Sequence, residues 1–200
     1  IKEVIILTGY HEHIIKEAIK DKFQDIDIKY VTNEKYAETN NIYSLYLAKE
    51  FLKGDVIITA GDILTKPEVI KSVVQDKTPS IGVISPFREE LNGTCVQVNG
   101  CYIEKLFLKK DQDENFDRSE KFKTVNIFKF CQDFLENTFN PELEKHIQEN
   151  KVNDFYEIVL QSLFTNFDHN IFAHIIEKED WTEVDTPQEL KEAEEIVAKW

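Results

Sequence analysis

Two aspartates follow short β-prone segments and precede a turn or a helix start. Asp62 closes the run at residues 56–62, and Asp185 lies within the segment at residues 180–187. In an α/β sheet such positions face the crevice outside the strand ends, where ligands bind. Two carboxylates that converge there suit Mg²⁺, which commonly takes one or two carboxylates plus substrate phosphates. Each aspartate can equally be a helix N-cap, because a proline at the first turn of a helix follows each of them.

Basic side chains gather near the middle of the chain. Lysines stand at positions 109, 110, 121 and 123, and lysine is a common partner of phosphate groups. Arg88, directly after a predicted strand, can bind a phosphate through two hydrogen bonds or pair with a neighbouring glutamate. Asn126 interrupts an apolar strand, and a buried amide needs a partner, for which a ligand is one candidate.

Polar and aromatic residues mark two further helix starts. Asn40, Asn41 and Ser44 lie where free N–H groups and the helix dipole favour polar or anionic ligands. One asparagine can cap the helix and leave the other side chain free, although a cap with a solvated loop explains the same pattern. Tyr156 and Glu157 suit an alkylammonium group, or else belong to the core.

The composition limits the classes of function. The 200 residues carry a formal net charge of −14, with 42% hydrophobic and 31% charged residues. This length predicts one domain over residues 1–200, with a real core. The acidic balance argues against nonspecific binding of nucleic acid or anionic membrane. No apolar run approaches the roughly 18 residues that cross a bilayer, so we expect no membrane insertion.

Cysteines and histidines show no metal-binding spacing. The three cysteines form no CxxC pair, and the five histidines do not lie at ligand spacing from them. We therefore expect reduced thiols in a cytoplasmic protein rather than a zinc site or a thiol enzyme. The sequence opens in a strand and contains no Met, which we interpret as a segment of a longer protein.

The elements that position these residues alternate along the first part of the chain. Strands are predicted at residues 4–8, 26–31, 56–62 and 81–85. Helices are predicted between them, at residues 11–23, 41–52 and 66–74. This order predicts an α/β fold with a mostly parallel sheet flanked by helices.

The second part of the chain differs. Antiparallel strands are predicted at residues 94–98, 101–108 and 123–130, with Asn99-Gly100 as a hairpin turn. Three helices are predicted at residues 131–138, 141–149 and 154–164. A strand at 171–176, the Asp185 segment and a helix at residues 187–200 complete the chain. The result is a mixed sheet with a small antiparallel section.

Four segments resemble, in their order along the chain, the sugar-phosphate-type nucleotidyltransferases. They are residues 40–47 (NNIYSLYL), Gly61-Asp62, residues 123–127 (KTVNI) and residues 183–187 (EVDTP). The resemblance covers essentially the whole chain. It is strongest to the bacterial phosphocholine cytidylyltransferases and their relatives that act on substrates like 2-aminoethylphosphonate.

The resemblance implies a Rossmann-like nucleotidyltransferase fold and a CTP-dependent reaction. A phosphate or phosphonate of a small alcohol or amine attacks the α-phosphate of the nucleotide and pyrophosphate leaves. Positioning and neutralisation of charge by Mg²⁺ and cations carry such a reaction.

The resemblance also implies residue roles, and matching positions make Asp62 and Asp185 the metal aspartates. The nucleotide-binding set comprises Asn40, Asn41, Ser44 and Gly61. Lys110 or Lys123 faces the acceptor phosphate, and the further substrate-binding set comprises Arg88, Asn126, Tyr156 and Glu157.

The chain departs from the family at its start. The family opens with a strand, a Gly-rich loop with Arg and a Lys-containing segment, and residue 1 matches a point after them. We therefore expect this chain alone to be an incomplete enzyme, fused to or associated with another domain. The alternative is a noncatalytic nucleotidyltransferase-like module that binds a ligand or partner within a larger protein.

Two further comparisons narrow the interpretation. The strand around Thr94 and Cys95 lacks a Trp, which argues against an aromatic choline cage. A glycosyltransferase of similar fold needs a DxD-like motif at a strand end, whereas Asp111-Gln112-Asp113 lies in a charged loop.

Overall fold

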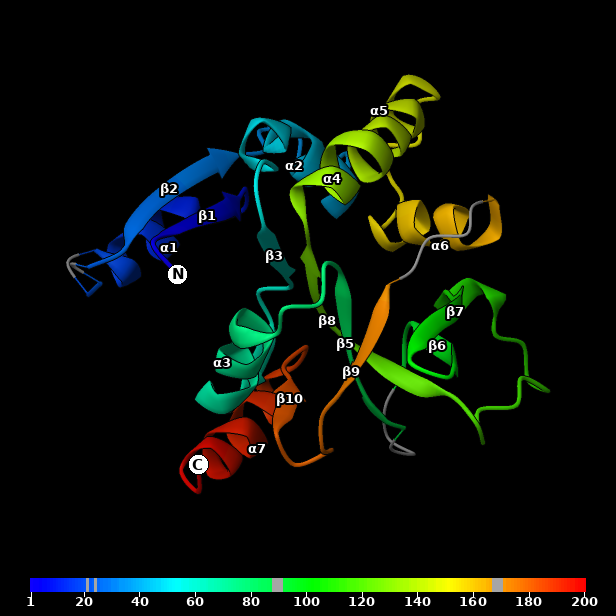
Figure 1. Ribbon diagram of the computed structural model, residues 1–200. Helices are drawn as coiled ribbons and strands as arrows, with labels where there is room; N and C mark the ends of the chain where they lie inside the picture. The colour runs from blue at the N-terminus through cyan, green and yellow to red at the C-terminus, as the bar shows by residue number, and fades with distance from the viewer. Residues whose placement is uncertain (21, 24, 88–91, 167–170) are drawn as a thin grey trace. The chain divides into compact units, whose positions relative to one another are not determined.

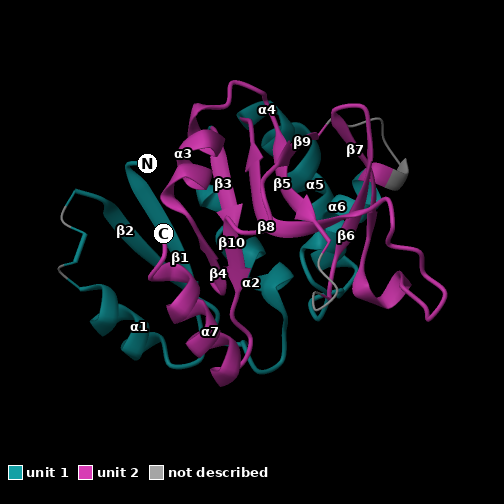
Figure 2. Ribbon diagram, turned by 90° about the horizontal axis from the view of Figure 1, so that it is seen from below, with its two compact units in different colours: residues 1–54, 132–163 teal, residues 55–131, 164–200 magenta. Residues whose placement is uncertain are grey.

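The computed structural model describes the chain except for residues 21, 24, 88–91 and 167–170 (Figure 1). The described chain divides into two compact units (Figure 2). Unit 1 comprises Ile1–Gly54 and Gln132–Leu163, and unit 2 comprises Asp55–Cys131 and Phe164–Trp200. Within the described residues, no helix is both long enough and apolar enough to cross a membrane.

Unit 1 begins with two parallel strands that are joined through a helix. Its first elements are β1 (Glu3–Thr8), α1 (Glu12–Ile19), β2 (Asp27–Thr32), α2 (Asn41–Leu47) and the 3-10 turn η1 (Lys49–Phe51). β1 and β2 pair in parallel from Glu3 with Asp27 to Thr8 with Thr32, as the predicted order of strand, helix and strand implies. The polar loop before α2 therefore leaves from the carboxyl end of β2.

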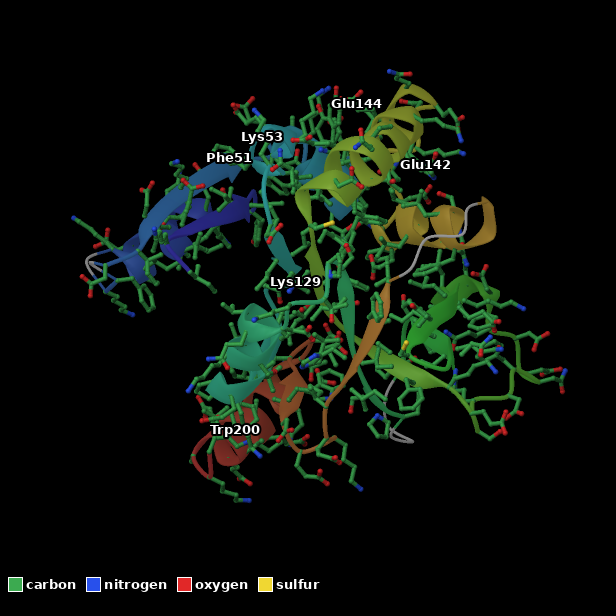
Figure 3. All side chains as sticks on the ribbon, viewed as in Figure 1. Phe51, Lys53, Lys129, Glu142, Glu144 and Trp200 are labelled. Carbon is green, nitrogen blue, oxygen red and sulfur yellow. The ribbon has the colours of Figure 1, made fainter. Side chains whose placement is uncertain are left out.

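A continuous helical segment returns the chain to unit 1. It contains α4 (Gln132–Phe134), a π-helical turn η3 (Leu135–Phe139) and α5 (Asn140–Gln148). Pro141 stands at the first turn of α5, directly after the π-helical turn, so the break predicted between residues 138 and 141 does not occur. α6 (Glu157–Asn166) follows. On α5, Glu144 bonds Lys49 and Glu142 accepts a bond from Ser162 (Figure 3).

Unit 2 contains the larger sheet. Its elements are β3 (Val56–Thr59), β4 (Ile63–Thr65), α3 (Pro67–Gln75), β5 (Ile81–Pro86), β6 (Cys95–Asn99), β7 (Tyr102–Phe107), the turn η2 (Lys109–Asp111), β8 (Phe122–Phe130), β9 (Phe172–Ile175), β10 (Trp181–Glu183) and α7 (Pro187–Val197). Six strands form one sheet in the order β3-β8-β5-β9-β7-β6, and β4 pairs with β10.

The pairing confirms a mixed sheet, but the prediction that it is mostly parallel was wrong. Among the described strands, β1 with β2 and β5 with β9 are parallel, and the other pairs are antiparallel. The reason is β8, which runs antiparallel between β3 and β5 and separates these two strands. The Asn99-Gly100 hairpin between β6 and β7 was predicted correctly, and Gly100 takes a positive φ of 61° there.

The core of unit 2 joins one face of the sheet to α3 and β10. Val73, Val83, Ile127 and Trp181 are members of one buried apolar cluster, each at most 1% exposed. Lys129 on β8 is also buried, and its Nζ donates to the carbonyl oxygen of Asp76 after α3 (Figure 3). The core thus fixes β8 and β10, the two strands that carry the charged residues described next.

Candidate functional site

The pairing of β4 with β10 brings the segments of the two aspartates together. Asp62 lies in the turn between β3 and β4, three residues after β3 ends, and not at the end of one long strand as predicted. Glu183 faces Ile63 in the register, and the Val184 N–H donates to the Asp62 carbonyl oxygen at 3.0 Å. The backbones of Asp62 and Asp185 therefore lie on adjacent segments at one end of the β4–β10 pair.

Neither aspartate serves as a helix N-cap. Lys66 is the N-cap of α3, and Thr186 caps α7 by accepting a hydrogen bond from the Glu189 N–H at 3.2 Å. Both carboxylates are exposed, and within the described part of the chain neither has a side-chain hydrogen bond or an ion pair. The alternative in which these aspartates only cap helices is thereby removed, while their metal role stays a prediction.

A buried lysine lies beside this end of β10. Lys123 on β8 is 1% exposed, and its Nζ donates to the Thr124 carbonyl oxygen at 2.9 Å. The same Nζ lies 3.9 Å from Oε2 of Glu183 and 5.8 Å from the ring centroid of Trp181. Gly93 lies beside this lysine, and a Cβ placed on it would lie 3.5 Å from the Nζ atom, which is an ordinary van der Waals contact.

Burial and neighbouring charges shift the pKa of Glu183. Burial raises the pKa of its carboxyl, Lys123 opposes that rise, and Asp185 and Asp62 add to it. Both aspartate carboxylates are therefore near enough to repel a charge on Glu183. Such a group of carboxylates favours a bound cation, because the cation relieves their mutual repulsion.

The carboxylates of Asp62 and Asp185 are oxygen donors of the kind that Mg²⁺ takes. Over the described ranges, no three His, Cys, Asp or Glu side chains are grouped so as to hold a metal ion. A site with two protein ligands still fits Mg²⁺, whose remaining ligands are commonly waters and substrate phosphates.

Asn126 adopts an unusual backbone in the middle of β8. Its φ is +55°, and the register of β8 with β5 shifts at this point. Its carbonyl oxygen accepts from the Ala60 N–H at 3.2 Å, just before Gly61 and Asp62. Its side-chain Oδ1 lies 3.2 Å from the Thr124 hydroxyl. Bulges of this kind occur beside active sites, and here the bulged residue is hydrogen-bonded to the segment that leads into the Asp62 turn.

In unit 1 a buried asparagine that sequence reasoning missed organises the loop before α2. Asn33 is 2% exposed, and its Nδ2 donates to the hydroxyl oxygens of Ser44 and Thr39, each at 3.0 Å. Its Oδ1 accepts from the Lys35 N–H at 2.9 Å. Its place directly after the β2 strand was the signal that could have found it.

The doubled asparagine does not leave a wholly free side chain. Asn40 Oδ1 accepts from the Asn41 N–H at 2.7 Å, and Asn41 Oδ1 accepts from the Tyr156 N–H at 2.7 Å. The expectation of an unengaged amide is therefore wrong for the oxygen of Asn41. The bond also joins two predicted site residues of unit 1, at the starts of α2 and α6.

The remaining predicted residues have varied surroundings. Tyr156 and Glu157 are 6% and 7% exposed, so they are buried rather than open. Lys110 is exposed in η2, and Gly61 is exposed with nothing within 4 Å of a Cβ placed on it. Arg88 lies outside the described residues.

Known proteins are similar to this chain in sequence, and solved structures are similar to it in fold. No family model matches the sequence. A CMP-5'-(3-aminopropyl)phosphonate synthase of Streptomyces rubellomurinus is 26% identical over 195 residues, which are 97% of this chain and 31% of that protein. A choline-phosphate cytidylyltransferase of Streptococcus pneumoniae is 39% identical over 66 residues, which are 33% of this chain and 27% of that protein.

The fold agrees with a solved structure over nearly the whole chain. The CTP:phosphocholine cytidylyltransferase structure from Streptococcus pneumoniae matches with a TM-score of 0.77 at 20% identity, and the match covers 98% of this chain and 78% of that one. The chain is similar to cytidylyltransferases in sequence and to nucleotidyltransferases in fold. The α/β nucleotidyltransferase fold implied by the resemblance is confirmed. The chain nevertheless spans less than a third of the two sequence relatives named above.

Proposed function

We propose that the protein transfers a cytidylyl group from CTP to a small phosphorylated or phosphonate alcohol or amine, such as phosphocholine or 2-aminoethylphosphonate. The observation that carries this proposal is the arrangement in unit 2. Two aspartates with no structural partner among the described residues lie at one end of the β4–β10 pair, and Lys123 is buried beside Glu183. The sequence relatives that act on an aminopropylphosphonate and on choline phosphate support the choice of acceptor.

The reaction exchanges one bond to phosphorus for another. An oxygen of the acceptor phosphate or phosphonate forms a bond to the α-phosphorus of CTP, and the bond to the leaving pyrophosphate breaks. Asp62 and Asp185 hold Mg²⁺, which when bound neutralises phosphate charge and orients the triphosphate. Lys123 or Lys110 supplies positive charge for the acceptor phosphate, and a preorganised cation stabilises charge that develops in the transition state.

Residues of unit 1 bind the organic parts of the substrates in this proposal. Asn40, Asn41 and Ser44 contact the nucleotide, and the amide of Asn41 still has its N–H groups to donate. Tyr156 and Glu157 favour a cationic amine head group. Asn126, together with Arg88, completes the substrate-binding set.

The test measures pyrophosphate release by the full-length protein with Mg²⁺. CTP, ATP, GTP and UTP are each combined with phosphocholine, phosphoethanolamine, 2-aminoethylphosphonate and glucose 1-phosphate. We expect release with CTP and an amine acceptor, and a higher apparent KM for the amines in Glu157→Gln. A preference for glucose 1-phosphate would refute the acceptor class, and equal rates with all four nucleotides would refute the cytidine assignment. A protein that binds CTP without turnover would favour the noncatalytic binding module.

A further inference from the structure

Three cationic side chains of unit 2 act electrostatically on one buried thiol. Cys95 on β6 is 0% exposed and lies opposite Phe107 of β7 and Lys123 of β8 in the strand registers. Burial raises the pKa of Cys95 to about 11, while Lys121, Arg118 and Lys123 oppose that rise. All three cations are therefore close enough to act on the same sulfur, in a chain whose net charge is −14.

Two of these cations lack an acidic partner. Across the part of the chain that the structure describes, neither Arg118 nor Lys121 forms an ion pair, whereas the Nζ atom of Lys123 lies 3.9 Å from Oε2 of Glu183. Asp117 is an acidic group whose pKa Lys121 helps to lower, but it forms no ion pair with Lys121 among the described residues, and its carboxylate accepts from the Ser119 N–H. Bringing like charges together without neutralising them is unfavourable, and a bound anion would remove that cost.

Arg118 is held in place by a neutral group. Oε1 of Gln112 accepts from Nη2 of Arg118 at 2.9 Å and from its Nε at 3.3 Å. Nε2 of Gln112 donates to the carbonyl oxygens of Gly93 at 2.7 Å and Phe107 at 3.2 Å, so the amide can present only its oxygen to Arg118. The guanidinium is thus fixed without being neutralised, and the other N–H groups of its fork can bind phosphate oxygens.

Lys121 is also held without neutralisation. Its Nζ lies 5.4 Å from the ring centroid of Phe107 and 5.3 Å from that of Phe116. The two rings contact each other with centroids 5.2 Å apart. Aromatic faces attract an ammonium ion but leave its positive charge in place.

We propose that Arg118 and Lys121, next to Lys123, bind a phosphoryl or phosphonyl group of a substrate, with Gln112 as the residue that positions Arg118. This inference rests on the proposed function, because it adds binding residues to the same reaction. Lys123 links this cluster to Glu183 and hence to the aspartate pair. Arg118 is one of only two arginines in the sequence, the other being Arg88, and no motif distinguishes it.

The test compares Arg118→Gln, Arg118→Lys and Gln112→Met with wild type in the full-length protein. Lys71→Gln is the control, because it removes one exposed positive charge from α3 of the same unit. The apparent KM for the acceptor, the apparent KM for CTP and kcat are measured separately. We expect Arg118→Gln to raise one KM by about 10- to 100-fold, because a hydrogen bond to a charged group is lost. Arg118→Lys recovers part of that loss, Gln112→Met causes a smaller rise, and Lys71→Gln changes neither KM.

The affected substrate identifies the source of the anion. A raised KM for the acceptor assigns the cluster to the acceptor group, and a raised KM for CTP assigns it to the triphosphate. An unchanged KM for both substrates in Arg118→Gln would overturn the inference while leaving the proposed function in place.

A second readout does not need turnover. Binding of inorganic phosphate and of methylphosphonate is measured by calorimetry on the same variants. Weaker binding in Arg118→Gln than in Lys71→Gln supports the anion site even if no nucleotide is turned over. Equal binding by both variants, or none by wild type, refutes it.

Discussion

The two units use their polar site residues in different ways. In unit 1, Asn41 Oδ1 accepts from the Tyr156 N–H and Ser44 accepts from the buried Asn33. In unit 2, Asp62 and Asp185 have no such bonds among the described residues, although their charges act on Glu183. Hydrogen bonds within the fold explain why the polar side chains stand at these positions in unit 1. Among the described residues, no such bond explains the two carboxylates of unit 2. Unpartnered charge is therefore the stronger sign of a ligand.

The largest effect should come from the carboxylates of unit 2. Asp62→Asn and Asp185→Asn should each lower kcat by about 100- to 1,000-fold, the size found when one group that stabilises charge in the transition state is removed. The free energy of unfolding should change by less than about 0.5 kcal/mol, because among the described residues neither side chain caps a helix or forms an ion pair. Pyrophosphate release and urea unfolding measure the two quantities. A stability loss as large as that of a lost helix cap would return these residues to a structural role.

Lys123 should contribute to both stability and activity. Lys123→Met leaves the half-buried carboxyl of Glu183 without its cation, so the free energy of unfolding should fall by about 2 kcal/mol. Lys123→Met with Glu183→Gln should recover part of that stability while activity stays low. Urea unfolding of the two single variants and the double variant completes the cycle. Strictly additive losses would show that the two groups do not interact.

In unit 1 the structural role of Asn41 can be separated from ligand binding. Asn41→Ala removes the acceptor of the Tyr156 N–H, so stability should fall by about 1 kcal/mol. Asn41→Asp keeps that oxygen and lacks only the amide N–H groups. If those N–H groups bind the nucleotide, both variants lose part of the thermal shift that CTP and Mg²⁺ cause. A normal shift in Asn41→Asp would make Asn41 a purely structural residue.

Asp76 is a partnered carboxylate in the same unit as Asp62 and should behave in the opposite way. Hydrogen bonds from Thr78 and then the contact with His174 lower its pKa from 3.8 to about 2. The stabilisation is therefore complete above pH 3.8 and is lost as the pH falls toward 2. Asp76→Asn should cost about 1 kcal/mol at pH 7 after screening by solvent, with normal kcat. Urea unfolding between pH 2 and pH 7 checks this, and a difference that persists at pH 2 would contradict it.

Local patterns predicted most elements, but they did not predict how strands pair over long distances. The apolar run of β1 and the Asn99-Gly100 turn were sufficient for correct local predictions. The antiparallel direction of β8 was predicted, but its place between β3 and β5 was not, because that place depends on contacts with strands distant in the sequence. The π-helical turn before Asn140 likewise carried the helix through Pro141, which local rules treat as a helix start.

The candidate site was predictable where charge followed a short β-prone segment. Asp62 and Asp185 could be named because each precedes a turn or a helix, and Lys123 because it belongs to a lysine cluster. Asn33, Glu183 and the cluster of Gln112 and Arg118 were missed, since their roles depend on contacts between distant strands and loops. The positive φ of Asn126 was hidden for the same reason, although its polarity within an apolar strand was visible.

The central claim is that Asp62 and Asp185 share one divalent cation. Mn²⁺ binding to the full-length protein with CTP, measured by electron paramagnetic resonance, tests it most directly because Mn²⁺ can replace Mg²⁺ at oxygen ligands. We predict one tightly bound ion per chain in wild type and in Asp76→Asn, and its loss in Asp62→Asn and in Asp185→Asn. Retention of the tightly bound ion in either of these last two variants would contradict the account.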